Sequence, residues 1–212
     1  MNIRPKLVLD FGTANCVILD SNENVLLNEP TTVAIDIKTN KVLAVGSKAQ
    51  MIFGKEPGNI SAVRPLKNGG VSNLKLANVL LHEFLKKSLG RNKIFSPDVI
   101  ISVPSKINSL EERALVKILK NYGVNKITLV PESYAAGLGA DLPIEKSIAS
   151  MIVNIGGGTS EVAIFSMKGI IMADSGMNAG DDLNTEIVNF IRKEFDVLVG
   201  DVTAEKLKID LG

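Results

Sequence analysis

Two stretches of the chain, far apart, have the same order of apolar and polar positions. Residues 7–9 are apolar, residues 10–15 break the run with glycine and polar side chains, and residues 17–19 are apolar again. Residues 151–165 repeat this order, with a break that contains three consecutive glycines. Apolar segments on either side of a tight glycine turn are typical of β-hairpins. The repeat therefore predicts a duplicated fold with one such hairpin in each half.

Between the two hairpins the apolar spacing changes from strand to helix and back. Residues 32–36 and 42–45 are predicted to be short strands, and residues 53–73, which are rich in Gly, Pro and Asn, are predicted to be mainly loop. Residues 74–89 have apolar positions at helical spacing. The apolar run at residues 99–103, in which Ser102 is the only polar residue, is typical of a strand that is covered on both faces of a sheet.

The second half of the chain continues the alternation of helices and strands. Ser109, followed three residues later by Glu112, fits a capping box that begins a helix, and Gly123 is expected to end it. A further helix is predicted from about Asp181, and the start of a last helix at residues 203–212. The first of these two is expected to bury its apolar side chains, Leu183, Ile187, Phe190 and Ile191. This order of elements predicts an α/β fold with a partly parallel sheet.

The composition is that of an ordinary globular protein, with 45% apolar and 22% charged residues. The formal net charge of +1 offers no electrostatic argument for a nucleic-acid partner. Cys16 is the only cysteine, so an internal disulfide is excluded, and we expect a buried apolar side chain in a cytosolic protein. No apolar run approaches the length of a membrane span.

The two glycine turns carry the candidate chemistry. Turns of this kind expose backbone N–H groups with no side chain in the way, which suits phosphate oxygens. Two such turns in a duplicated fold can hold one polyphosphate from both sides. The two halves differ where the first strand of each hairpin ends, because Asp10 stands in one and Asn154 in the other.

The hairpin loops resemble those of the actin, heat-shock chaperone and sugar-kinase superfamily, which read strand-Asp-x-Gly-Thr and strand-x-x-Gly-Gly-Gly-Thr. Within this superfamily the chain is most similar to the MreB family of bacterial actin-like cell-shape proteins. The stretches that carry the resemblance cover nearly the whole chain, at residues 10–15, 27–30, 42–46, 57–60, 62–67, 155–159 and 203–208.

The resemblance implies an actin-like (ribonuclease H-like) α/β fold, in which two lobes enclose a nucleotide cleft. The first lobe would span residues 1–145, with a small inserted outer subdomain at about 30–75. Residues 146–212 would be the start of a truncated second lobe. An incomplete second lobe fits either a fragment or a naturally short paralogue.

The resemblance also implies the roles of individual residues. Asp10 would hold Mg²⁺ through water, and Glu132 and Thr159 would position the water that attacks ATP. Asn154 stands where the family normally has a catalytic aspartate; its amide can hydrogen-bond a water but cannot accept a proton. Contacts with ATP would come from both phosphate loops, a helix-entering turn and the last helix: Gly12, Thr13, Ala14, Asn15, Gly156, Gly157, Gly158, Thr159, Gly180, Asp181, Glu205, Lys206, Leu207 and Lys208.

A segment between Gly90 and Pro97 carries two apolar side chains, Ile94 and Phe95. In the family a comparable apolar loop dips into the membrane surface, so the resemblance implies a membrane contact here. The alternative is that these side chains pack back on the core.

The function implied by the resemblance is that of a bacterial cytoskeletal protein, which binds ATP and Mg²⁺ and polymerises into membrane-associated filaments that determine cell shape. It would lie in the cytoplasm at the inner face of the cell membrane, with copies of itself and full-length paralogues as partners and no nucleic acid. ATP hydrolysis would be weak at most. The main alternative is a hydrolysis-deficient or truncated paralogue that only co-assembles with filaments or regulates them. A chaperone-type module and a sugar or acetate kinase of the same superfamily are less favoured, because neither a substrate domain nor a second pocket is evident.

Overall fold

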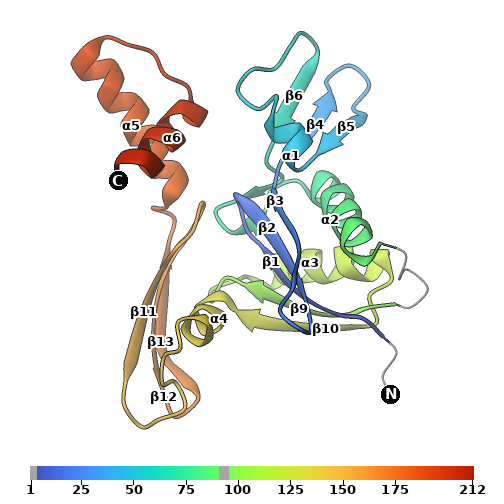
Figure 1. Cartoon of the computed structure of the whole chain (residues 1–212), viewed down its shortest axis with the longest axis vertical. Coiled ribbons are helices and arrows are strands. Elements are labelled where there is room, and N and C mark those ends of the chain that lie inside the picture. The colour runs from blue at the N-terminus through green and yellow to red at the C-terminus, as the bar shows by residue number, and fades with distance from the viewer. Residues whose placement is uncertain (1–3, 91–95) are drawn as a thin grey trace.

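The computed structural model describes residues 4–90 and 96–212, whose arrangement is shown in Figure 1. The expected membrane contact of Ile94 and Phe95 lies outside the described residues. No helix in the two described ranges is both long and apolar enough to cross a bilayer.

The first half of the chain is built around a five-stranded mixed sheet. Its strands are β1 (Lys6–Phe11), β2 (Asn15–Asp20), β3 (Val25–Pro30), β9 (Asp98–Val103) and β10 (Lys126–Pro131). Their order in the sheet is β10-β9-β1-β2-β3 (Figure 1). β1, β2 and β3 form an antiparallel meander, whereas β9 runs parallel to both β1 and β10. The predicted α/β fold with a partly parallel sheet is therefore confirmed.

Two helices, α2 (Leu74–Leu89) and α3 (Ser109–Tyr122), pack on one face of this sheet and enclose the main core with it. α2 has the predicted bounds, and its predicted apolar face is completely buried: Ala77, Leu80, Leu81, Phe84 and Leu85. Cys16 belongs to the same core, as predicted, and burial raises the pKa of its thiol. The opposite face of the sheet is open, since Ile100 in the middle of β9 is 44% exposed. The expectation that this strand is covered on both faces was wrong, because an apolar run does not reveal which face finds a partner.

The beginning of α3 lies one residue earlier than the sequence pattern predicts. Asn108, not Ser109, is the N-cap, and its side-chain oxygen accepts hydrogen bonds from the backbone N–H groups of Leu110 and Glu111. The carboxylate of Glu111 accepts the Asn108 N–H in return, which completes the capping box. Gly123 ends the helix in the left-handed region, with a φ of 98°, as expected.

A smaller sheet stands apart from the main one and contains β4 (Val33–Asp36), β5 (Val42–Val45) and β6 (Ile60–Val63) in the order β5-β4-β6 (Figure 1). A single helical turn, α1 (Ser47–Gln50), packs beside it. A short hairpin, β7 (Leu66–Lys67) and β8 (Gly70–Val71), leads back to the main core. The expectation of mainly loop at residues 53–73 was therefore partly wrong, because β6 pairs with β4 along its whole length.

The second half repeats the antiparallel meander of the first. β11 (Ser150–Ile155), β12 (Ser160–Ser166) and β13 (Gly169–Gly176) pair in the order β11-β12-β13. One face of this sheet packs on α4 (Glu132–Gly139) around a small core that contains Ala163 and Phe165. The other face leaves apolar side chains such as Val153 53% exposed. The duplication predicted from the two hairpins is confirmed.

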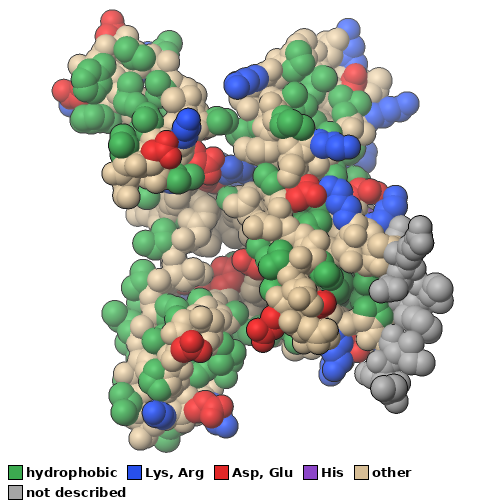
Figure 2. Space-filling view, in the orientation of Figure 1, with side chains coloured by type: hydrophobic (Ala, Val, Ile, Leu, Met, Phe, Trp, Pro, Cys, Tyr) green, Lys and Arg blue, Asp and Glu red, His purple; other side chains and the backbone are tan. Residues whose placement is uncertain are grey.

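Two helices, α5 (Gly180–Phe195) and α6 (Asp201–Leu211), follow and pack against each other (Figure 1). Leu183 and Phe190 on α5 are 52% and 58% exposed, so the expectation that they are buried was wrong. α6 is the main described element in contact with α5, and it leaves part of the apolar face uncovered. Apolar side chains accordingly appear on the surface of this region in Figure 2.

Candidate nucleotide site

The two glycine turns have the same local geometry and lie against each other. In the first turn the Gly12 N–H donates to the Asn15 carbonyl at 3.0 Å, and in the second the Gly156 N–H donates to the Thr159 carbonyl at 2.8 Å. A Cβ on Gly158 would lie 2.6 Å from Thr13 Oγ1, which is closer than side-chain atoms can approach. Glycine is therefore required for the close contact between the two turns.

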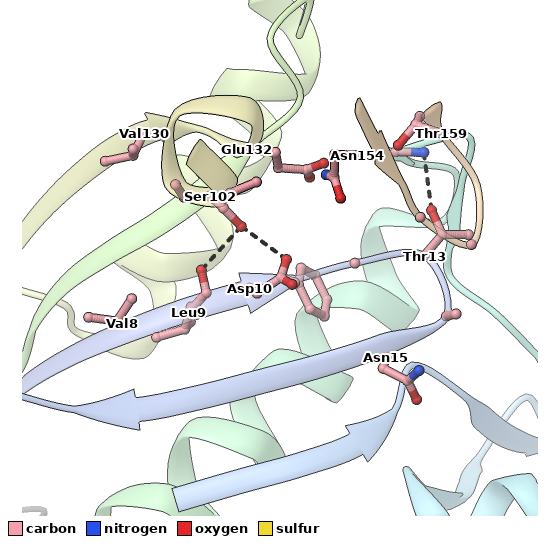
Figure 3. Close-up of a pocket in the computed structure, with 18 of the residues that line it drawn as sticks. Val8, Leu9, Asp10, Thr13, Asn15, Ser102, Val130, Glu132, Asn154 and Thr159 are labelled. Carbon is pink, nitrogen blue, oxygen red and sulfur yellow. Dashed lines mark hydrogen bonds between the residues drawn. The ribbon is translucent and has the colours of Figure 1, made fainter. Parts of the chain in front are cut away.

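A cavity of about 730 Å³ opens beside this contact. Its volume is in the range of pockets that bind small molecules and cofactors. The side chains of Asp10, Glu132 and Asn154 point into it from β1, α4 and β11 (Figure 3). The structure thus brings eleven of the candidate residues together around one cavity: Asp10, Gly12, Thr13, Ala14, Asn15, Glu132, Asn154, Gly156, Gly157, Gly158 and Thr159.

Asp10 is the penultimate residue of β1 and lines this cavity. Its Oδ1 accepts a hydrogen bond from Ser102 Oγ at 3.0 Å, and it forms no ion pair with any other described residue (Figure 3). Burial raises the pKa of this carboxyl, and the hydrogen bond from Ser102 lowers it in part. A bound cation would stabilise the ionised form. The site residues fit Mg²⁺ in this respect, because Mg²⁺ typically uses one or two carboxylates together with waters and substrate phosphates.

Within the described ranges, no group of three or more His, Cys, Asp or Glu side chains stands ready to hold a metal ion. Asp10 is therefore a single carboxylate rather than part of a protein cage, an arrangement that is typical of Mg²⁺ coordinated mainly by water and phosphate oxygens.

Glu132 is the first residue of α4 and lies at the other side of the cavity. Burial raises its pKa to about 7, and the negative charges of Asp10 and Glu161 add to this shift. A carboxyl group that titrates near neutral pH can hold or release a proton under working conditions. Asn154, whose side chain lies next to that of Glu132 in Figure 3, can only donate or accept hydrogen bonds.

The remaining candidate residues do not line this cavity. The Gly180 and Asp181 N–H groups, expected to face an anion, donate instead to the carbonyls of Gly156 and Gly157 at 3.0 and 2.8 Å. The turn before α5 therefore supports the second glycine loop. Lys208 on α6 donates from Nζ to the Gly180 carbonyl at 2.8 Å and fixes the turn from outside. The other candidates on α6, which are Glu205, Lys206 and Leu207, also lie away from the lining of the cavity.

Three residues near the site were not predicted. Arg64 forms an ion pair with Asp181, with 2.8 Å between Nη1 and Oδ1. The Gly69 N–H donates to Thr13 Oγ1 at 3.1 Å. Glu161 is completely buried on β12. Only Glu161 left a signal in the sequence, as a charged residue at the start of an apolar strand.

Two lobes that each begin with a three-stranded antiparallel meander, and that meet through paired glycine hairpins over a cavity, define an actin-like fold. MreB5 of Spiroplasma citri, in a crystal structure bound to ADP, superposes with a TM-score of 0.90 and 34% sequence identity over 97% of this chain and 61% of its own. A MamK double helical filament structure shares the fold at a TM-score of 0.81 and 21% identity, covering 98% of this chain and 65% of its own.

The sequence comparisons identify the family. The family model described as MreB/Mbl protein matches residues 4–212, and the chain belongs to this family. The cell shape-determining protein Mbl of Bacillus subtilis (strain 168) is 37% identical over 95% of this chain and 60% of its own length. The cell shape-determining protein MreB of Escherichia coli (strain K12) is 36% identical over 97% of this chain and 61% of its own. The chain therefore spans about three fifths of the length of these relatives.

Proposed function

We propose that this chain carries the nucleotide-binding site of an actin-like cytoskeletal protein, and that it binds ATP with Mg²⁺ between its two glycine hairpins. The observation that supports this most directly is the contact of Gly157 and Gly158 with the first hairpin beside a cavity that Asp10 enters. Related proteins support it as well, since MreB5 of Spiroplasma citri has been solved with ADP and with AMPPNP.

In the proposed complex the chain supplies orientation and hydrogen bonds rather than covalent chemistry. Backbone N–H groups of both hairpins would donate to phosphate oxygens, and Thr13 and Thr159 add hydroxyl groups at the same edge. Asp10 would hold the waters of Mg²⁺, which neutralises phosphate charge when bound. Glu132, with Thr159 opposite, would position a water for attack on the terminal phosphate.

Asn154 supports a second candidate function, that of a family member that binds ATP and joins filaments but hydrolyses ATP slowly or not at all. An amide cannot take a proton from the attacking water and adds no negative charge near Mg²⁺. Polymerisation, contact with the inner membrane surface through Ile94 and Phe95, and co-assembly with full-length paralogues are part of the same proposal. Membership of the MreB/Mbl family supports these parts of the proposal, and so do the names of the relatives, which are cell shape-determining proteins.

The test is sedimentation of the purified chain with Mg-ATP, ADP or no nucleotide, with phosphate release followed in the same samples. Pelleting that depends on ATP and is accompanied by phosphate release supports an ATPase filament protein. Pelleting without phosphate release selects the hydrolysis-deficient candidate. A chain that neither pellets nor binds ATP contradicts the proposal. Liposome co-sedimentation of a variant with Ile94→Ser and Phe95→Ser tests the membrane contact separately.

A further inference from the structure

Glu161 is the only completely buried carboxylate in the described parts of the chain, and nothing in the proposed function uses it. It lies at the start of β12, directly after the second glycine loop. Its side chain leaves the second lobe and reaches Ser105, in the segment that connects β9 to α3 in the first lobe. Burying a charge is costly unless it is well hydrogen-bonded, so this contact requires an explanation.

The carboxylate is bound by a directed chain of hydrogen bonds. Oε1 accepts the backbone N–H of Ser105 at 2.7 Å, and Oε2 accepts the Ser105 hydroxyl at 2.9 Å. Ser105 Oγ also lies 2.7 Å from Ser133 Oγ. Because the single hydroxyl proton of Ser105 points to Glu161, Ser133 must donate to Ser105. The three side chains therefore form one polarised series from Ser133 through Ser105 to Glu161.

Both ends of this series adjoin residues of the candidate site. Ser133 is completely buried and follows Glu132 in the first turn of α4, which has no side-chain N-cap of its own. Glu161 pairs across the sheet with Asn154, so their side chains lie on the same face. The negative charge of Glu161 also contributes to the raised pKa of Glu132. One buried carboxylate thus connects to the elements that carry Glu132 and Asn154, whose side chains lie side by side in the cavity (Figure 3).

We propose that Glu161 is a positioning residue for the hydrolytic step: through Ser105 and Ser133 it fixes the first turn of α4, and with it Glu132, at a set distance from Asn154 and the second glycine loop. This inference rests on the proposed ATP-dependent function. It adds that a buried series of hydrogen bonds, and not the nucleotide alone, fixes the relative position of the two lobes next to the attacking water. A displacement of about 1 Å at such a position can cost roughly 100-fold in rate.

The experiment compares three variants of the chain. Ser133→Ala removes only the last link and keeps the contact between Glu161 and Ser105. Glu161→Gln removes the charge and keeps the shape. Asp174→Asn is the matched control, because Asp174 on β13 bonds to Lys106, the neighbour of Ser105. This substitution breaks an exposed contact between the same two segments and leaves the buried series intact. The kinetic and binding readouts are the rate constant for phosphate release at saturating ATP and the dissociation constant of a fluorescent ATP analogue. The structural readouts are the melting temperature and amide hydrogen exchange of the first turn of α4.

The expected result is a loss of roughly tenfold or more in the phosphate-release rate for Ser133→Ala and Glu161→Gln. Their affinity for the ATP analogue should change less than about twofold, and hydrogen exchange at residues 133–136 should be faster. Asp174→Asn should match the wild type. Unchanged rates in both variants overturn the inference, and so does a loss of rate that only follows lost affinity or melting temperature. If the wild-type chain binds ATP but releases no phosphate, both this inference and the proposed hydrolysis of ATP are overturned. If it does not bind ATP, the proposed function itself is overturned.

Discussion

Arg64 and Asp181 form an ion pair between the segment that follows β6 and the first turn of α5. The guanidinium also lies over the ring of Phe53, 5.5 Å from its centroid. The side chains of Arg64 and Asp181 are 16% and 38% exposed, so the pair is only partly screened by water. It links the small outer sheet to the turn that supports the second glycine loop.

We expect Arg64→Gln to lower the free energy of unfolding by about 1–2 kcal/mol, which lies between the values for exposed and buried ion pairs. It should also weaken ATP binding, because the turn at Gly180 loses its connection to the outer sheet. Urea unfolding and binding of a fluorescent ATP analogue measure the two effects. Glu145→Gln, which breaks the exposed pair with Lys168, is the control and should change neither. Equal effects of both substitutions would contradict the role given to Arg64.

The contact between the hairpins predicts the effect of adding one methyl group. A Cβ at Gly158 would meet Thr13 Oγ1, so Gly158→Ala should push the loops apart and weaken ATP binding roughly tenfold or more. Gly139→Ala is the control, because a Cβ there has no atom within 4 Å. Unchanged affinity in Gly158→Ala would show that the paired turns do not hold the nucleotide.

The raised pKa of Glu132 predicts a pH-dependent stability of the nucleotide-free chain. Between its ordinary value of 4.5 and about 7, the folded state keeps a proton that the unfolded state has lost, so stability falls as pH rises through this window. Glu132→Gln should therefore be more stable than the wild type by roughly 1–3 kcal/mol at pH 8, with a difference that shrinks toward pH 5. Urea unfolding from pH 5 to 8.5 measures this. Glu186 is exposed on α5, so Glu186→Gln should give no stability difference from the wild type that changes with pH. If the stability difference between Glu132→Gln and the wild type were the same at every pH, the raised pKa of Glu132 would be refuted.

The N-cap of α3 predicts different stability effects for substitutions at two adjacent positions, Asn108 and Ser109. Asn108→Ala should destabilise the chain by about 1 kcal/mol, because two N–H groups lose their acceptor. Ser109→Ala should be almost neutral, since Ser109 is the first helical residue. Denaturant midpoints of the two variants decide between the observed cap and the cap predicted from the sequence.

The features that sequence reasoning found are those that depend on neighbouring residues. The hairpins at Asp10 and Asn154 and helix α2 follow from turn chemistry and apolar spacing within short windows. The contacts that connect the lobes join residues 117 positions apart, for Arg64 and Asp181, or 56 apart, for Ser105 and Glu161. No local pattern encodes such pairs.

Burial on α5 and β9 was misjudged for a related reason. Apolar spacing shows that Leu183 and Ile100 lie on an apolar face, but it cannot show whether another element covers that face. The turn at Gly180 is a different case: the family resemblance implied that its N–H groups face the nucleotide, whereas the fold uses them to support the second loop.

The central claim is that Asp10 and the paired glycine turns form one site for ATP and Mg²⁺. Titration calorimetry of the wild type and of Asp10→Asn, each with Mg²⁺ and with EDTA, tests it most directly. We predict one ATP per wild-type chain, an affinity in Mg²⁺ that falls about tenfold or more in Asp10→Asn, and no loss in EDTA, because Asp10 acts through the metal. The absence of ATP binding to the wild type, or an equal loss with and without Mg²⁺, would contradict the claim.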